Sequence, residues 1–244
     1  YKDKHPSLIT LPEWKEMVLL LPTSQDYNTP TTLSFHLSSS YHLQVLRSKV
    51  LEDLTICGAV CLVLTHDNKL VYGIRAGKFK SNTVSAVPAG IISFFPHSSN
   101  YLLDTVYSEL KEELGLSSTD VKKPTLIGYY TDPGLNSLIF LFVTTTHYSS
   151  KQLNAIHRKA YAYYTSSLAN KKSEMQSREA IVTHGCANKD AWEHSALVFL
   201  QTDHIFLQSL IDSRSVSYQT KLYPLLDLGR APLILYLEYR KRFP

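Results

Sequence analysis

Two segments of the chain indicate its fold. They are Val87-Pro-Ala-Gly90 and, after a short loop, Tyr101-Leu-Leu-Asp-Thr-Val-Tyr-Ser-Glu-Leu-Lys-Glu-Glu-Leu-Gly-Leu116. The second part predicts a helix, because residues 98–100 offer N-cap side chains and Gly115 stands where a C-terminal cap belongs. Apolar side chains recur along it at helical spacing, which gives one side that can dock on a sheet. The stretch therefore predicts a turn, a variable loop and an amphipathic helix.

Three glutamates on this helix, Glu109, Glu112 and Glu113, are spaced i, i+3 and i+4, so that their carboxylates project from one face. Like charges at this spacing repel each other, and the repulsion grows sharply where the face is covered. A divalent cation would relieve it, since Mg²⁺ typically binds a few carboxylates together with substrate phosphates. Taken alone, the spacing favours a solvated acidic face; the Pro-Ala-Gly turn that follows a predicted strand favours the metal site.

Here the sequence resembles the Nudix hydrolase family, whose signature is Gly-x5-Glu-x7-Arg-Glu-U-x-Glu-Glu-x-Gly-U, with U aliphatic. Residues 109–116 match the last eight positions of this signature. Gly90 matches the opening glycine when the loop after it carries a four-residue insertion. The resemblance covers roughly residues 55–145 and 190–212. These bounds are approximate, because a sequence fixes the ends of helices and strands poorly.

Two positions depart from the signature. The arginine that in the family braces the glutamates through a salt bridge is Ser108 here, and the isolated upstream glutamate falls on Asn100, with Asp104 as a displaced substitute. The metal-binding core therefore matches the family, while its supporting residues do not. These departures leave open a Nudix-fold module that binds a nucleotide or a protein without turnover. An unrelated α/β domain with a Glu-rich helix, a third interpretation, predicts no specific divalent-metal binding.

By resemblance, the protein is a hydrolase that uses Mg²⁺ or Mn²⁺ to cleave the pyrophosphate linkage of a nucleoside diphosphate joined to another moiety, X. Glu109, Glu112 and Glu113 would hold the ion together with the main-chain carbonyl of Ala89, a hard oxygen donor. The ion would neutralise the phosphates and lower the pKa of a water. One of these glutamates, or Glu193, would accept the proton of the attacking water.

The turn after the helix gives a clue to the substrate. Tyr130-Thr-Asp-Pro-Gly134 resembles the Ser-Pro-Gly turn of ADP-ribose and nucleotide-sugar pyrophosphatases, which favours these two substrate classes. Tyr129 or Tyr130 would stack on a base, since a tyrosine combines an apolar face with a polar tip. Pro-Gly is equally common in ordinary turns, so a simple strand connection stays open.

Basic residues follow a predicted hairpin with strands at 56–64 and 70–74. In the family, an arginine that leaves the second strand commonly faces the substrate phosphates, and a guanidinium suits this role because it makes bidentate contacts with phosphate oxygens. Arg75 and Lys78 are therefore the predicted substrate contacts. The alternative is that Arg75, Lys78 and Lys80 are solvated charges at the end of the hairpin.

Glu193 stands beside His194 at the entrance to the last predicted strand. In many family members a glutamate beyond the signature helix completes the metal site or serves as the base, which makes Glu193 the first candidate and Glu174 and Glu179 the next ones. A surface Glu-His pair is the alternative, and the residues by themselves favour it.

The arrangement of apolar runs and helices predicts an α/β fold, a Nudix-type α/β/α sandwich with a mixed sheet between helices. Residues 1–50 are expected to form an N-terminal extension that packs on the main domain. Residues 51–215 would form that domain, with an insertion at about 149–190 made of a helix and a polar linking loop. Residues 216–244 would form a C-terminal helical segment.

Composition limits the function classes. The chain has 244 residues, 44% of them hydrophobic, and a net charge of +4, which fits an anionic small-molecule substrate but is too weak to indicate nucleic acid. No apolar run reaches the length of a membrane span, and no signal peptide is apparent. Three cysteines without a Cys-x-x-Cys pair indicate a reducing compartment, so an intracellular, cytoplasmic protein is expected. A homodimer stays open.

Overall fold

The computed structural model describes residues 17–22, 36–39, 54–76, 80–93, 98–132, 137–170 and 173–243. The strands are β1 (Met17–Pro22), β2 (His36–Ser39), β3 (Leu54–Leu64), β4 (Lys69–Arg75), β5 (Val84–Ala86), β6 (Ala89–Ile91), β7 (Thr125–Asp132), β8 (Ser137–Thr145), β9 (His194–Gln201), β10 (Ser215–Tyr218) and β11 (Lys221–Pro224). The helices are α2 (Tyr101–Leu114), α3 (Ser150–Ala169), α4 (Glu174–Thr183), α5 (His204–Ser213) and α6 (Asp227–Arg242), with a 3₁₀ turn, η3 (Ala191–Glu193).

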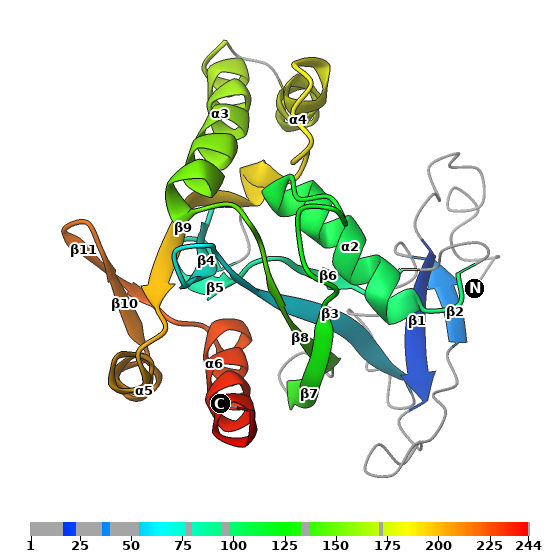
Figure 1. Cartoon of the computed structure of the whole chain (residues 1–244). Helices are drawn as coiled ribbons and strands as arrows, with labels where there is room; N and C mark the ends of the chain where they lie inside the picture. Colours follow the sequence, from blue (N-terminus) through cyan, green and yellow to red (C-terminus); the bar gives the residue numbers. More distant parts are fainter. Residues whose placement is uncertain are drawn as a thin grey trace.

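Nine of these strands form one mixed sheet (Figure 1). β3 runs parallel to β8 from Ile56 to Leu64, and antiparallel to β1, β4 and β6. β4 pairs antiparallel with β5 and β9, and β7 pairs antiparallel with β8. Since β1 joins β3, part of the N-terminal extension belongs to the sheet. The predicted mixed sheet is confirmed.

β3 shows why the sheet has helices on both faces. Its side chains alternate: Val60 and Leu62 belong to the hydrophobic cluster that α5 and α6 cover, whereas Cys57, Cys61 and Val63 belong to the cluster that α2 covers. A strand buried on both faces is apolar along its whole length, as this one is. The two clusters lie on opposite faces of the sheet, which confirms the α/β/α sandwich.

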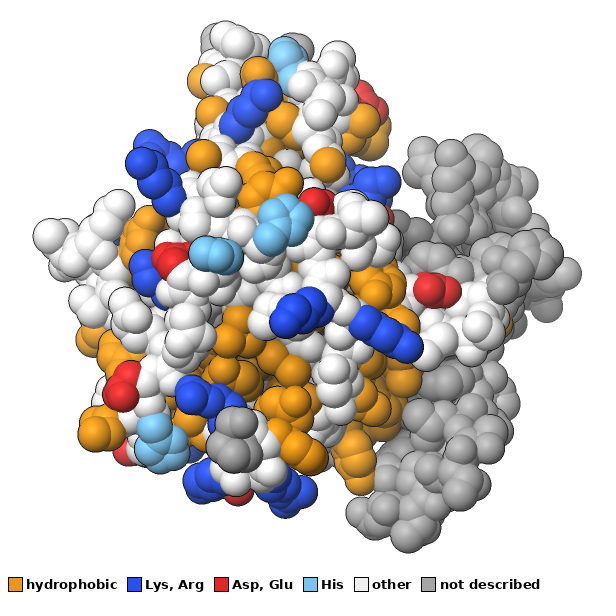
Figure 2. All heavy atoms as spheres, viewed as in Figure 1, with side chains coloured by type: hydrophobic (Ala, Val, Ile, Leu, Met, Phe, Trp, Pro, Cys, Tyr) orange, Lys and Arg blue, Asp and Glu red, His pale blue; other side chains and the backbone are white. Residues whose placement is uncertain are grey.

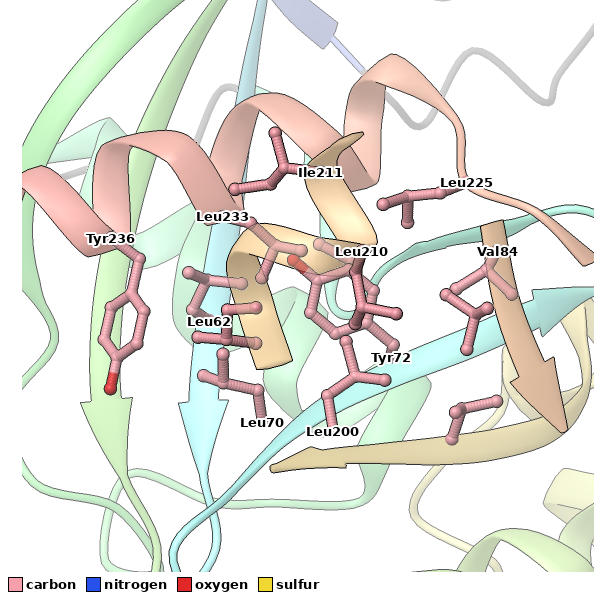
Figure 3. Packing of buried hydrophobic residues seen from close by; sticks show 14 of the residues in the cluster. Leu62, Leu70, Tyr72, Val84, Leu200, Leu210, Ile211, Leu225, Leu233 and Tyr236 are labelled. Carbon is pink, nitrogen blue, oxygen red and sulfur yellow. The ribbon is translucent and has the colours of Figure 1, made fainter. Parts of the chain in front are cut away.

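The cluster under α5 and α6 is the larger of the two, and Figure 3 shows how its residues pack. Leu210 of α5 and Leu233 of α6 pack there against the sheet, and the buried Tyr72 hydroxyl donates a hydrogen bond to the Gly229 carbonyl of α6 (2.9 Å). The C-terminal part of the chain is therefore more than the predicted helical segment: it begins with the β10–β11 hairpin, and α6 closes the main core.

The insertion differs from the prediction of one helix and a polar loop. Two helices, α3 and α4, are present, and each begins with a capping box, in which Ser173 and Gln176 exchange side chain–backbone hydrogen bonds at the start of α4. The two helices and η3 share a small buried cluster around Ala160, Ile181 and Ala191. The insertion thus supports the segment that precedes β9.

The surface agrees with the modest net charge. On the face shown in Figure 2, Lys and Arg side chains are dispersed rather than gathered into one stripe. None of the helices in the described residues is long and apolar enough to cross a membrane.

Candidate functional site

α2 begins and ends as its sequence predicts. The Asn100 side chain accepts a hydrogen bond from the Leu103 N–H (3.1 Å), and Gly115 takes a left-handed conformation with φ 73°. Asn100 therefore acts as an N-cap at the position where the signature has a glutamate, and Asp104 lies in the first turn of the helix. Burial of Leu110 and its apolar neighbours against the sheet fixes the rotation of α2.

This rotation presents Glu109 and Glu113, one helical turn apart, to the β6 turn. Glu109 lies directly over Gly90: a Cβ atom added at Gly90 would come within 1.9 Å of the Glu109 Oε1 atom. Glu113 Oε1 accepts a hydrogen bond from the Ala89 N–H (3.0 Å). Its Oε2 atom is buried and has no hydrogen-bond partner. Gly90 is thus needed because any side chain would occupy the place of a carboxylate.

The predicted role of the Ala89 carbonyl is compatible with the backbone. Cys61 N–H donates to Pro88 O (3.0 Å) and Ile92 N–H donates to Cys57 O (2.9 Å), so these two positions of the turn face β3. Hydrogen-bonded and non-hydrogen-bonded pairs alternate in an antiparallel ladder, so both the N–H and the C=O of Ala89 point away from β3. They point to the side on which Glu113 lies.

Glu113 also lies beside His194, whose Nδ1 atom is 3.6 Å from Glu113 Oε2. Burial lowers the pKa of His194 to about 3, and the nearby Arg75 acts in the same direction. Burial, followed by the charges of Glu109 and Glu193, raises the pKa of Glu113 well above its ordinary value, against the Ala89 hydrogen bond. Burial therefore favours the uncharged form of both side chains.

Three further acids around this point have raised pKa values, with burial as the largest cause for each. The pKa of Glu109 rises to about 8, and Glu112, Asp190 and Glu193 contribute to this rise. The pKa of Asp190 and that of Glu193 are also raised, the latter against the opposing effect of Arg75. Four partly or fully buried acids with raised pKa values therefore lie close together, and their carboxylates would repel each other if all were ionised.

The donor set fits a hard divalent cation. An ion would remove the repulsion among the acids and would give the orphaned Glu113 Oε2 a partner. As the side chains stand, no three His, Cys, Asp or Glu residues of the described part of the chain converge closely enough to hold an ion. Glu109 and Glu113 face the turn, whereas Glu112 is directed elsewhere.

Glu112 is held by two other residues. Ser108 Oγ donates a hydrogen bond to Glu112 Oε1 (2.9 Å), and Lys189 Nζ lies 3.1 Å from the same oxygen. The backbone N–H of Asp190 donates to the Glu112 carbonyl (2.8 Å), which ties the segment before η3 to the helix. The position where the signature has an arginine thus takes part in holding a glutamate, through a hydroxyl.

The structure brings Arg75 and Glu193 together. Arg75 Nη2 lies 3.8 Å from Glu193 Oε2, and the Ala76 N–H donates to the Glu193 carbonyl (2.7 Å). Glu193 raises the pKa of Glu113, and Arg75 lowers the pKa of Glu193 and that of His194, so both lie near the buried acids. Lys78 lies outside the described residues.

Other predicted positions are not brought to the cluster. Tyr130 packs against the hydrophobic cluster under α6, and burial raises the pKa of its hydroxyl, which has no hydrogen-bond partner. Tyr129 is largely exposed and inclined against Phe140. Glu174 pairs with Arg178 along α4, and Glu179 is exposed on the same helix. The turn at 133–136 lies outside the described residues.

Sequence reasoning missed Lys189, Asp190 and His194. His194 adjoins the predicted Glu193, so strand alternation offered a signal for it. Nothing in the local sequence indicates that Lys189 reaches Glu112, because the contact joins residues that are far apart in the chain.

A pocket of about 340 Å³ lies between α3, β9 and the β10–β11 hairpin. Arg158, Tyr218 and Tyr223 contribute to its walls, together with Ile74 and Ser195, which adjoin Arg75 and His194 in the chain. None of the acidic residues of the cluster lines it, so the pocket and the carboxylates are separate features.

No protein-family model and no curated protein matches the chain. Among solved structures, the chain is similar to a Nudix hydrolase from Nitrosomonas europaea, with 13% identity and a TM-score of 0.42 over 93% of this chain and 88% of that one. It is similar to the Nudix domain of Shewanella oneidensis NrtR complexed with ADP-ribose, with 13% identity and a TM-score of 0.40 over 78% and 89%. It is also similar to a MutT protein from Methanosarcina mazei, with 10% identity and a TM-score of 0.40 over 77% and 94%. No residue's role in this chain follows from these likenesses.

Proposed function

We propose that the protein is a Nudix-type hydrolase that depends on Mg²⁺ or Mn²⁺ and cleaves the pyrophosphate linkage of a nucleoside diphosphate-X substrate. One observation carries this proposal: the buried Glu113 accepts a hydrogen bond from Ala89 through one oxygen and leaves the other without a partner, beside Glu109 over Gly90. A buried carboxylate oxygen without a donor is costly, and a cation removes that cost.

Glu109, Glu113 and the Ala89 carbonyl are the residues that would hold the ion, whereas Glu112 contacts Ser108 and Lys189. When bound, the ion supplies charge neutralisation for the phosphates and lowers the pKa of a water. By fixing the position of the cation, these residues would orient the pyrophosphate.

Arg75 and Glu193 have complementary roles in the proposal. The guanidinium of Arg75 binds phosphate oxygens and stabilises the charge that develops on them. Glu193 accepts the proton of the attacking water, and its raised pKa brings it closer to the pH at which a general base works best. A nucleotide sugar or ADP-ribose is the favoured substrate class, on the resemblance of the turn after β7. A homodimer and an intracellular location stay predictions from the sequence.

Phosphatase-coupled release tests this function on a panel of nucleotide sugars, ADP-ribose and nucleoside triphosphates, with Mg²⁺, with Mn²⁺ and with EDTA. The wild type is compared with Glu113→Gln, and with Glu238→Gln as a control on the exposed end of α6. The proposal expects metal-dependent release that Glu113→Gln abolishes and Glu238→Gln leaves intact.

The alternative is a module that binds a nucleotide without turnover. Ser108 in the signature, and the absence of a closed three-carboxylate group among the described residues, favour it. Mn²⁺ binding without release from any compound of the panel would establish this alternative and overturn the hydrolase.

A further inference from the structure

The proposed function makes no use of the pocket of about 340 Å³ at the β9 edge of the sheet, where β9 pairs only with β4 among the described strands. This volume lies within the range of small-molecule sites. The walls of the pocket come from α3, from β4 and β9, and from the β10–β11 hairpin (Figure 1). We propose that the pocket binds a nucleoside monophosphate, with the base against the tyrosines of the hairpin and the phosphate at Arg158.

A β-bulge in β9 separates this pocket from the acidic cluster. Ser195 has no partner in β4, because the register of the two strands shifts at this point. Residues two apart in a regular strand share a face, but here His194 lies beside Glu113, whereas Ala196 packs against the hydrophobic cluster under α5 and α6. Ser195 and Ala196 both line the pocket. The bulge therefore allows one short segment to serve the acidic cluster on one face and the pocket on the other.

The β10–β11 hairpin supplies an aromatic wall. Val216 pairs with Tyr223, and Tyr218 follows Val216 by two residues, so the two tyrosines are diagonal neighbours on one face of the hairpin. Both tyrosines are half-buried and pack against the hydrophobic cluster under α5 and α6, in which Val216 is buried. Rings held in this way offer a flat apolar surface with a polar tip, and such a surface suits stacking with a base of any kind.

The α3 wall carries a positive charge. Asn154 and Arg158 are one helical turn apart, so both side chains leave the same side of α3. Arg158 forms no salt bridge with any acid in the part of the chain that the structure describes, and none of the described Asp and Glu residues lines the pocket. A guanidinium without a counter-ion favours an anion, and its fork of donors matches phosphate oxygens.

The lining residues together select the class of ligand. Inorganic phosphate would leave the two tyrosines without a partner, and a neutral aromatic compound would leave the charge of Arg158 without one. Arg158 is the one Lys, Arg or His among the described residues that line the pocket, so a single phosphate group is favoured over a longer chain of phosphates. Asn154 and Gln219 add amide donors and acceptors, which can bond to the edge of a base.

Isothermal titration calorimetry with AMP tests this site. The titration is made in EDTA, so that no divalent ion occupies the acidic cluster and the result does not depend on the proposed hydrolysis. The variants are Arg158→Gln and Asn154→Trp, the second of which fills the pocket from α3. Lys159→Gln is the matched control, since Lys159 is the next residue of the same helix, is exposed, carries the same charge and does not line the pocket. Arg75→Gln reports on binding at the proposed catalytic site instead.

Arg158→Gln is expected to weaken AMP binding at least about tenfold, because a charge-assisted contact is lost, while Lys159→Gln and Arg75→Gln stay within about twofold of the wild type. Adenosine should bind more weakly than AMP, and equally to the wild type and Arg158→Gln. Asn154→Trp should abolish binding of both compounds.

Three results would overturn the inference: no AMP binding by the wild type, unchanged affinity in Arg158→Gln, or full affinity in a folded Asn154→Trp. A loss of affinity in Arg75→Gln without one in Arg158→Gln would also overturn it, because AMP would then lie at the acidic cluster. None of these results bears on the metal-dependent release that tests the proposed function.

Discussion

Replacing Gly90 with alanine should separate metal binding from folding. The new Cβ atom would lie 1.9 Å from Oε1, 2.2 Å from Cδ and 2.8 Å from Cγ of Glu109. To reach van der Waals separation, the carboxylate has to retreat by roughly 1.5 Å. The backbone needs no change, because Gly90 does not have a positive φ. The cost to folding is therefore that of turning one flexible side chain, about 1 kcal/mol.

The cost to metal binding is larger. Mg²⁺ demands near-ideal geometry with oxygen ligands at about 2.0–2.1 Å, so a displacement of roughly 1.5 Å removes Glu109 from the ligand set. Mn²⁺ affinity is expected to fall at least about tenfold. Hydrolysis is expected to fall by about 10²-fold, since misplacement of a positioning group by about 1 Å has effects of that size.

The assay pairs Mn²⁺ titration with urea unfolding, and Gly128→Ala is the control. A Cβ at Gly128 would meet only Leu235 methyl groups at 3.7 and 3.8 Å, an ordinary contact. Wild-type Mn²⁺ affinity in Gly90→Ala would show that the Glu109 carboxylate is not a ligand. Loss of the folded state would show that the space at Gly90 serves packing and not the ion.

In EDTA, the free energy of unfolding should fall as pH rises from about 4.5 to 8, because folded Glu109 keeps a proton that the unfolded state has released. The fall is about 1.4 kcal/mol per pH unit for Glu109 alone. Urea unfolding at pH 5, 6.5 and 8 checks this, and a flat profile contradicts it. In EDTA at pH 7, Glu113→Gln should melt a few degrees higher than the wild type, because the substitution removes a buried acid with a raised pKa. Calorimetry measures this, and a lower melting temperature would mean that the carboxylate is needed for packing. Leu233→Ala, at a fully buried position, should cost about 2–5 kcal/mol in urea unfolding, whereas a cost under about 1 kcal/mol would mean that α6 is not part of the core.

What could be predicted from the sequence was local. The α2 helix follows from caps at its two ends and from apolar spacing, and the β3–β4 hairpin follows from two apolar runs and a turn at Asn68, which has φ 54°. The gathering of Glu109 and Glu113 follows from helical periodicity alone. These features depend on neighbours a few residues apart.

Features that depend on tertiary contacts were not accessible. Lys189 reaches Glu112 only because the α3–α4 insertion and η3 hold its segment against α2. The face of Tyr130 could not be read from alternation, because the register of β7 shifts between Leu126 and Gly128, and such a shift exchanges the two faces. The capping box at the start of α4 can be recognised in the sequence. The helix that follows has few apolar side chains, however, so its helical periodicity is weak.

Crystals grown with Mn²⁺ and measured at a wavelength where manganese scatters anomalously would locate the ion itself. We expect a peak in the anomalous difference map that is coordinated by Glu109, Glu113 and the Ala89 carbonyl, with Glu113 Oε2 as a ligand. A peak elsewhere, or none in a protein that still hydrolyses a nucleoside diphosphate derivative, would contradict the assignment of the α2–β6 cluster as the metal centre.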